Sequence, residues 1–224
     1  MEPSVFETLR EVLPELWVAL GQTALMLGCS LAAALLFGLP LGALLLLSGP
    51  GQPLERPRLF AVLNAVVNTV RSFPFIILMV ALVPLTRFVV GTTIGPLAAA
   101  VPLSFAAIPY FARLVEQSLR EVPRGVVEAA QAMGASNVQI VFKVLLPEAR
   151  SSLVSGYTVL AISLLSYSAV AGVVGGGGVG DLAIRYGYYR FQTEVMLLTV
   201  VVLVLLVQLI QFTGNRVAAR LDKR

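Results

Sequence analysis

Long apolar stretches separated by short polar segments dominate the chain. Stretches of membrane-spanning length cover about residues 17–47, 58–83, 93–119, 147–174 and 194–213. A helix that crosses a bilayer needs about 20 predominantly apolar residues. The pattern therefore predicts an all-α polytopic membrane protein with about five transmembrane helices.

Prolines fall inside several of these stretches, and each one removes a backbone hydrogen-bond donor. We expect the first span to tilt, or to bend at Pro40. The second span contains the helix-weakening pair Phe73-Pro74, and the third is expected to be interrupted at Pro102 and Pro109.

Composition agrees with the membrane assignment, because 58% of the residues are hydrophobic, 12% are charged and the mean hydropathy is +0.89. The length suits a single transmembrane domain over residues 1–224. There is no histidine, and Cys29 is the single cysteine. A disulfide framework within the chain, a zinc site and imidazole chemistry are thereby excluded, and no metal site is expected.

The basic residues predict the orientation of the spans, since short cytoplasmic loops carry an excess of Lys and Arg. Placing the turn near residues 48–57, the segment 113–150 and the C-terminal tail on one side collects eleven of the sixteen basic residues there. We therefore expect an external N-terminus and a cytoplasmic C-terminus. The scattered placement of these charges at loop boundaries argues against nucleic acid as a partner.

The cytoplasmic segment of about residues 120–146 is too polar and too broken to span. Pro123 suits the start of a short helix, and Gly134 suits its left-handed C-terminal position. Ser136 and Gln139 form a capping-box pattern that predicts a second short helix. The apolar stripe of this helix is expected to consist of Val138, Val141, Val144 and Leu145. Two such pieces could lie on the membrane surface or could form a docking surface for another protein.

The spacing of this segment is specific. Glu128-Ala129-Ala130 is followed by Gly134, by an aliphatic residue at Val144 and by a Leu-Pro pair. The pattern resembles the cytoplasmic EAA signature of permease subunits in binding-protein-dependent ABC importers, in which this helix couples the permease to the ATPase. By this resemblance the coupling residues are Glu128, Ala129, Ala130, Met133, Gly134, Leu146 and Pro147.

Further motifs resemble those of the methionine-uptake permeases and cover most of the chain from about residue 55 onward. They are Arg71-Ser72-Phe73-Pro74-Phe75, Ala112-Arg113-Leu114-Val115-Glu116, Tyr167-Ser168-Ala169, the glycine run Gly175-Gly176-Gly177-Gly178-Val179-Gly180, Tyr186-Gly187-Tyr188 and Leu209-Ile210-Gln211-Phe212. The resemblance implies import of methionine, as the L form alone or as both stereoisomers, with another amino acid or a quaternary amine as the alternative cargo.

The same resemblance implies the partners. The permease would form a homodimer in the bacterial inner membrane, with two ATP-binding cassette subunits and an external solute-binding protein. The chain itself carries no G-x-x-x-x-G-K-[ST] sequence, so ATP and Mg would be used by the partner and this chain would be no enzyme.

Polar residues within the spans are costly against lipid and often bridge helices or line a pathway. Arg71 is either a helix-end arginine or a residue that faces the substrate carboxylate. The candidate pathway residues are Asn64, Asn68, Arg71, Ser163, Tyr167 and Ser168.

The glycine run formally contains G-x-G-x-x-G, but it follows a membrane helix and no strand, which argues against dinucleotide binding. We expect an external loop of close backbone approach there. By resemblance, the binding protein would dock on outer loops, with Gly177, Gly178, Asp181 and Arg185 as candidates. A stand-alone channel or membrane scaffold is the competing class, and it leaves the coupling pattern unexplained.

Overall fold

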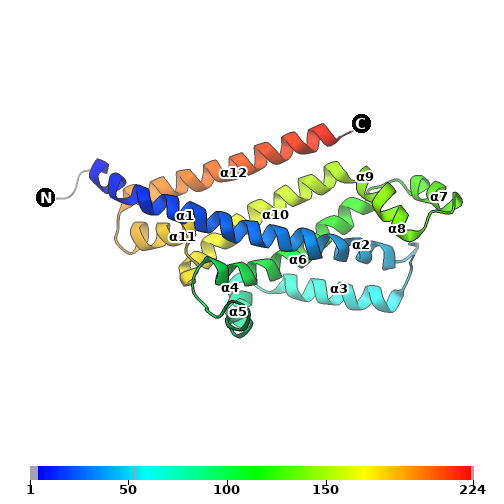
Figure 1. Cartoon of the computed structure of the whole chain (residues 1–224), viewed down its shortest axis with the longest axis horizontal. Helices are drawn as coiled ribbons and strands as arrows, with labels where there is room; N and C mark the ends of the chain where they lie inside the picture. The colour runs from blue at the N-terminus through cyan, green and yellow to red at the C-terminus, as the bar shows by residue number, and fades with distance from the viewer. Residues whose placement is uncertain (1–4, 53, 223–224) are drawn as a thin grey trace. The chain divides into compact units, whose positions relative to one another are not determined.

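The computed structural model describes residues 5–52 and 54–222, with side chains from residue 10 onward. All regular elements in this part of the chain are helical, and Figure 1 labels the α-helices in chain order. The all-α prediction is confirmed.

The first span is one continuous helical stretch. It consists of α1 (Val5–Ala33), a π-helical turn η1 (Ala34–Gly38) and α2 (Leu39–Ser48). Residues from Arg10 to Ser48 alone number 39, or about 58 Å of helix at 1.5 Å per residue. The π turn lies directly before Pro40, where the backbone lacks a donor, so the helix adjusts locally and continues.

The second predicted span is broken at the expected place. α3 (Pro57–Ser72) ends at Phe73, whose backbone is extended (φ −74°, ψ 130°), and α4 (Phe75–Ala81) begins after Pro74. The two helices qualify as a span only when they are taken together. Pro84 causes no break, because it lies in the first turn of α5 (Val83–Val90), where a missing donor costs nothing.

The third span, α6 (Pro96–Arg120), corrects the sequence prediction. It runs through Pro102 and Pro109 without interruption. Each proline removes one intrahelical bond, and membrane helices tolerate such losses where neighbouring groups satisfy the freed carbonyls.

The segment after α6 contains α7 (Arg124–Ala132), α8 (Asn137–Gln139), η2 (Ile140–Leu145) and α9 (Leu146–Glu148). The fourth span follows as α10 (Arg150–Ala171) with η3 (Gly172–Gly176), so it begins three residues later than Pro147, the predicted start. α11 (Gly178–Leu182) and η4 (Ala183–Tyr188) precede α12 (Thr193–Leu221), which extends well beyond residue 213. Together these elements give four spans, or five with the broken pair, which agrees with the predicted number.

The described chain divides into two compact units. The first comprises residues up to Leu31, Pro74–Phe105 and Ala161–Ile210, and the second comprises Ala32–Phe73, Ala106–Leu160 and residues from Gln211 onward. A single transmembrane domain over the whole chain stays a prediction. Its ends, residues 1–4 and 223–224, lie outside the described residues, as do the last two basic residues of the predicted cytoplasmic tail.

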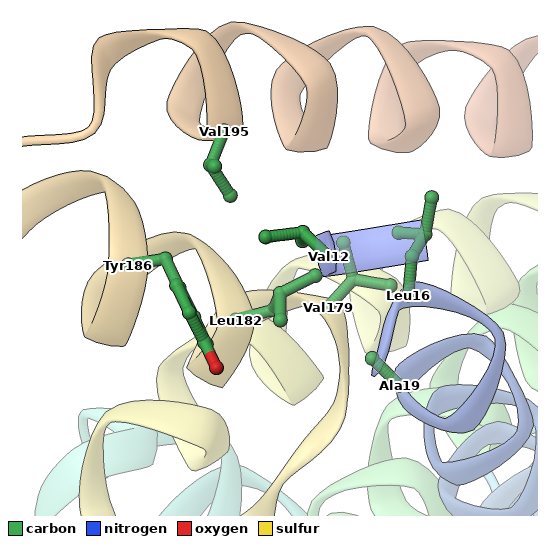
Figure 2. Packing of buried hydrophobic residues seen from close by; sticks show 7 residues of the cluster. All are labelled: Val12, Leu16, Ala19, Val179, Leu182, Tyr186 and Val195. Carbon is green, nitrogen blue, oxygen red and sulfur yellow. The ribbon is translucent and has the colours of Figure 1, made fainter. Parts of the chain in front are cut away.

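Each unit has its own buried cluster. In the first unit, side chains from α1, α11, η4 and α12 converge, as Figure 2 shows: Val12, Leu16, Ala19, Val179, Leu182, Tyr186 and Val195. In the second unit, Leu45, Val67 and Ala112 connect α2, α3 and α6. Only 11% of the most apolar window of α12 is buried within the chain, so most of that helix surface is left for lipid or another subunit.

Candidate functional site: the broken segment and its surroundings

The first helix of the broken segment begins as its sequence predicts. Pro123 is the N-cap of α7, and its carbonyl accepts a hydrogen bond from the backbone N–H of Val126 at 3.1 Å. The helix has nine residues, or about 14 Å at 1.5 Å per residue, which is half of a bilayer's hydrocarbon thickness. It cannot span the membrane.

Gly134 ends this helix in the left-handed conformation, with φ +76°. The N–H of Ala135 donates to the carbonyl of Ala130 at 3.0 Å, and the N–H of Gly134 donates to the carbonyl of Gln131 at 2.9 Å. This pair of bonds is a Schellman motif. The predicted conformation of Gly134 is confirmed.

The second helical piece begins with the predicted capping box. The N–H of Gln139 donates to the Ser136 hydroxyl at 3.3 Å, and the N–H of Ser136 donates to the Gln139 side-chain carbonyl at 2.8 Å. Two donors at the start of this piece are satisfied by these bonds. The helical backbone then continues through η2 and α9 and ends at Ala149.

The broken segment has one exposed and one buried face. Glu128 and Ala129 are exposed on α7, and Met133 is 82% exposed. Ala130, by contrast, is only 4% exposed, so its side chain supports α7 from within the chain. Of the predicted coupling residues, Gly134 and Pro147 are also exposed and Leu146 is partly buried.

The buried face of the second piece differs from the predicted apolar stripe. Val141 and Leu145 are buried as expected, but Val138 is 66% exposed. Ile140 is the most deeply buried residue there, with 1% exposure. The π-helical turn shifts the helical register in this stretch, so a spacing based on the α-helix alone selects the wrong residue.

A groove of about 360 Å³ lies between α7 and the turn that joins α2 to α3. Arg124, Glu128 and Gln131 line it from α7, and Gly51 lines it from the turn. Glu128 therefore faces both solvent and this groove, which places a charged side chain where another protein can reach it.

Directly before the broken segment, α6 carries a charged cluster. One oxygen of the Glu116 carboxylate accepts a hydrogen bond from Arg113, and the other accepts one from Arg120, each at 2.5 Å. Arg113 also donates to the side-chain oxygens of Asn64 at 2.6 Å and Asn68 at 2.8 Å. The structure therefore brings together two candidate pathway residues, and both are bound to an arginine.

Arg71 lies in the last turn of α3, where a positive charge is favourable at the helix C-terminus. Its guanidinium lies 5.7 Å from the centre of the Tyr110 ring, at cation–π distance. This position agrees with the helix-end interpretation, and a role in the pathway stays a prediction.

The other candidate pathway residues lie on α10 in the first unit. Tyr167 stacks on Phe75 of α4, with ring centres 4.9 Å apart. Ser168 is buried, and its hydroxyl donates to the carbonyl of Leu165 at 2.7 Å, while Ser163 is partly buried. The hydroxyl of Ser168 thus binds within its own helix. Tyr167, by contrast, contacts a second element, α4, through its ring.

The glycine run is a place of close backbone approach, as predicted, but it leads into a helix. Gly175, Gly177 and Gly178 have positive φ. A Cβ added at Gly180 would lie 2.4 Å from the Cα of Ala169, and one added at Gly172 would lie 2.4 Å from the backbone nitrogen of Asp181. The absence of side chains is therefore what lets α11 fold back against the end of α10.

Two α1 side chains fix the start of α11, which lies beside α1 in Figure 1. The N–H of Gly178 donates to the Gln22 side-chain oxygen at 2.7 Å, and the N–H of Val179 donates to the Thr23 hydroxyl at 3.0 Å. Gly178 is buried and Gly177 is partly buried. These two predicted docking residues therefore serve the packing of α11, and docking stays a prediction.

The other two predicted docking residues pair with each other. Arg185 lies 3.1 Å from Asp181 and 3.4 Å from Glu15 of α1. The Tyr186 hydroxyl donates to the same Glu15 carboxylate, and this hydrogen bond, together with burial, raises the pKa of Tyr186. The side chain of Arg185 is 47% exposed, so it remains accessible from outside the chain.

The sequence interpretation gave no role to several residues of these clusters. The sequence does contain a pattern that could have identified the cluster of Arg113, Glu116 and Arg120. Their spacing of three and four residues places three charges on one face of an apolar helix.

No local pattern identifies Arg150 and Ser151. They donate to the Leu221 and Ala218 carbonyls at 2.9 and 3.0 Å and hold the end of α12. That pairing depends on residues about 70 positions apart.

Long apolar helices, with short surface-exposed helices between two of them, define a polytopic membrane protein. A family model described as binding-protein-dependent transport system inner membrane component matches residues 34–224. The chain belongs to this family, and it is a multi-pass permease of the inner membrane.

Similar proteins with curated names cover nearly the whole chain. The probable D-methionine transport system permease protein MetI of Vibrio cholerae is 49% identical over 93% of each chain. The methionine import system permease protein MetP of Bacillus subtilis is 43% identical over 95% of this chain and 96% of its own.

A solved structure of the MetNI methionine ABC transporter, in an inward-facing conformation, contains a chain that superposes with a TM-score of 0.93. That chain is 44% identical, and the match covers 95% of this chain and 99% of the other. A chain of an amino acid ABC transporter with 17% identity and a TM-score of 0.78 shares the fold.

Proposed function

We propose that this chain is the permease subunit of an ATP-driven importer that moves methionine across the inner membrane. The observation that carries the proposal is the similarity over almost the whole chain to permeases named for methionine transport, with identities of 43–49%. The cargo includes L-methionine, and it extends to D-methionine because the Vibrio cholerae relative is named for the D form.

The transporter contains two copies of the chain and two ATP-binding subunits, and it receives its cargo from an external binding protein. The family description and the match to a chain of the MetNI transporter support this assembly. ATP and Mg are used by the ATP-binding subunits. An exposed α7, with Glu128, Ala129 and Met133 on its open face, suits the surface on which such a subunit docks.

The mechanism is alternating access. Closure of the ATP-binding subunits moves the two α7 helices, and the spans follow. The broken segment and the C-terminus face the cytoplasm, because the basic residues concentrate in these segments. The N-terminus is external, and the α11 region lies on the external side, where the binding protein docks near Asp181 and Arg185.

The test is to co-purify the chain with its ATP-binding subunit in mild detergent, reconstitute the complex in vesicles and add the candidate binding protein. ATP-dependent uptake of radiolabelled methionine is the expected result. Co-purification of an ATPase without methionine uptake would support an importer whose cargo is another amino acid or a quaternary amine. Absence of any ATPase partner would favour a channel or scaffold.

A further inference from the structure

Glu116 is the only charged residue among the buried residues of the described chain, with 3% exposure. A buried carboxylate is costly unless it is paired and hydrogen-bonded. Both of its oxygens are occupied, one by Arg113 and the other by Arg120. The two arginines lie on the same helix as Glu116, so the ion pairs require no contact with another helix.

The two arginines differ in what else they contact. Arg113 is held inside the cluster, with 24% exposure of its side chain, and its second terminal nitrogen donates to Asn64 and Asn68. Arg120 is 62% exposed and donates a hydrogen bond to Glu116. Arg113 therefore connects the buried Glu116 carboxylate of α6 to α3 by hydrogen bonds.

The two asparagines form a matched pair of acceptors on α3. They are four residues apart and so lie on one face of the helix. The amide of Asn68 donates to the side-chain oxygen of Asn64 at 3.4 Å, which orients both oxygens toward Arg113. The planar guanidinium suits this arrangement, because it presents several donors in a fixed geometry that lysine lacks.

The position of the cluster in the chain gives it a further consequence. α6 ends at Arg120, and α7 begins only four residues later, at Arg124. A movement of α7 is therefore passed along the chain to the C-terminal turns of α6. Arg113 hydrogen-bonds these turns to Asn64 and Asn68 of α3. When the turns move, α3 must therefore move with them, or these hydrogen bonds must break.

We propose that Arg113, fixed by Glu116, is a positioning residue that transmits displacement of the coupling helix to α3 through Asn64 and Asn68. The inference rests on the proposed function, since it assumes that α7 is moved by an ATP-binding subunit. It assigns Asn64 and Asn68 to the coupling apparatus instead of the substrate pathway.

The test uses the reconstituted complex of the full chain with its ATP-binding subunit and binding protein, and it measures methionine molecules imported per ATP hydrolysed. Arg113→Gln removes the contact to α3 together with one partner of Glu116. Arg120→Gln removes the other partner of Glu116 and leaves α3 attached. Arg58→Gln, at an exposed position at the start of α3, is the control for loss of one positive charge.

Arg113→Gln is expected to lower import per ATP by roughly fivefold or more, which is the lower end of typical coupling effects between sites. Arg120→Gln should have a clearly smaller effect, and Arg58→Gln should match the wild type. Adding Asn64→Ala and Asn68→Ala to Arg113→Gln should cause no further loss, because the contact is already absent. Melting temperature and subunit stoichiometry are measured for every variant, to separate coupling from folding.

Equal losses from Arg113→Gln and Arg120→Gln would overturn the proposal, because the contact to α3 would then have no special role. The Asn64→Ala and Asn68→Ala variants are also measured without Arg113→Gln. A raised KM for methionine in them, with unchanged import per ATP, would overturn the proposal in favour of a pathway role. Failure of the proposed function has a different signature, since the wild-type complex itself would then import no methionine.

Discussion

The backbone N–H of Ala135 donates to the carbonyl oxygen of Ala130 at 3.0 Å, across a glycine that ends α7 with φ +76°. Ala130 is buried, and the exposed Glu128 and Ala129 directly precede it. The hydrogen bond therefore fixes the end of the helix whose open face is proposed to contact the ATP-binding subunit.

Replacing Gly134 with Val is expected to uncouple ATP hydrolysis from uptake. A β-branched residue in the left-handed region costs roughly 1–2 kcal/mol, so the end of α7 should rearrange. The protein should still insert into the membrane, because no atom lies within 4 Å of a Cβ added at Gly134 and the substitution causes no steric clash there. The measurement is methionine import per ATP in reconstituted vesicles.

The matched control for this variant is Gly125→Val, in the same helix. Gly125 is exposed and has no atom within 4 Å of an added Cβ, but its φ is not positive. The control should transport normally. Normal coupling in Gly134→Val itself would contradict the assignment of this segment to coupling.

Gly42 should tolerate no side chain. An added Cβ would lie 2.4 Å from the Ala112 carbonyl oxygen and 2.6 Å from the Val115 Cβ, where α2 packs on α6. Overpacking of this kind typically costs about 1–3 kcal/mol. Gly42→Ala is therefore expected to lower the melting temperature of the detergent-solubilised protein.

Gly21→Ala is the comparison, because Gly21 has nothing within 4 Å of an added Cβ and lies inside α1. Alanine there should stabilise the helix by about 0.5–1 kcal/mol. A melting temperature that changes equally in the two variants would show that contact with α6 does not restrict position 42.

Local sequence patterns predicted the broken segment well. The left-handed Gly134 and the capping box of Ser136 and Gln139 depend only on residues a few positions apart, and both are present. The break at Phe73-Pro74 was predicted for the same reason. These features depend on local backbone geometry and not on which other helices pack against the segment.

Patterns that depend on tertiary contacts were predicted less well. The sequence suggested interruptions at Pro102 and Pro109, yet α6 continues through both. It also left Asn64 and Asn68 open to a pathway role, because their partner Arg113 is more than 40 residues away. The sequence shows that a polar group in a span needs a partner, but it does not show which one.

Loss of the Thr23 hydroxyl should loosen α11. Thr23 is 4% exposed and accepts the backbone N–H of the fully buried Val179. Thr23→Val keeps the shape and leaves that donor unsatisfied, at a cost of about 1–3 kcal/mol. Hydrogen exchange of the backbone amides in residues 176–182 should become faster.

Thr199→Val is the control for this substitution, since Thr199 is equally buried on α12. Its hydroxyl donates at 2.8 Å to the carbonyl of Met196 within the same helix. Losing this donor leaves no buried N–H unpaired, so exchange near α11 should stay unchanged. Unaltered exchange in Thr23→Val as well would mean that the hydroxyl does not stabilise α11.

Alkaline pH should weaken the contact between α1 and η4. The hydrogen bond from Tyr186 to Glu15 raises the pKa of Tyr186 above its ordinary value of 10.0, and burial adds to the effect. The nearby Arg185 and Arg190 favour the phenolate and oppose the shift. The folded protein nevertheless holds the phenolic proton more tightly than the unfolded chain does.

The resulting stabilisation is therefore complete below pH 10.0, and it is lost as the pH rises from there through the raised pKa. Thermal unfolding of the detergent-solubilised protein, measured from about pH 8 to 11, should show a steeper alkaline loss of stability in the wild type than in Tyr186→Phe. The two proteins differ by this hydroxyl alone, so the difference between the curves reports on Tyr186. Parallel curves would mean that the hydroxyl proton is held no more tightly in the folded state, and that packing in the cluster of Figure 2 is the main contribution of this side chain.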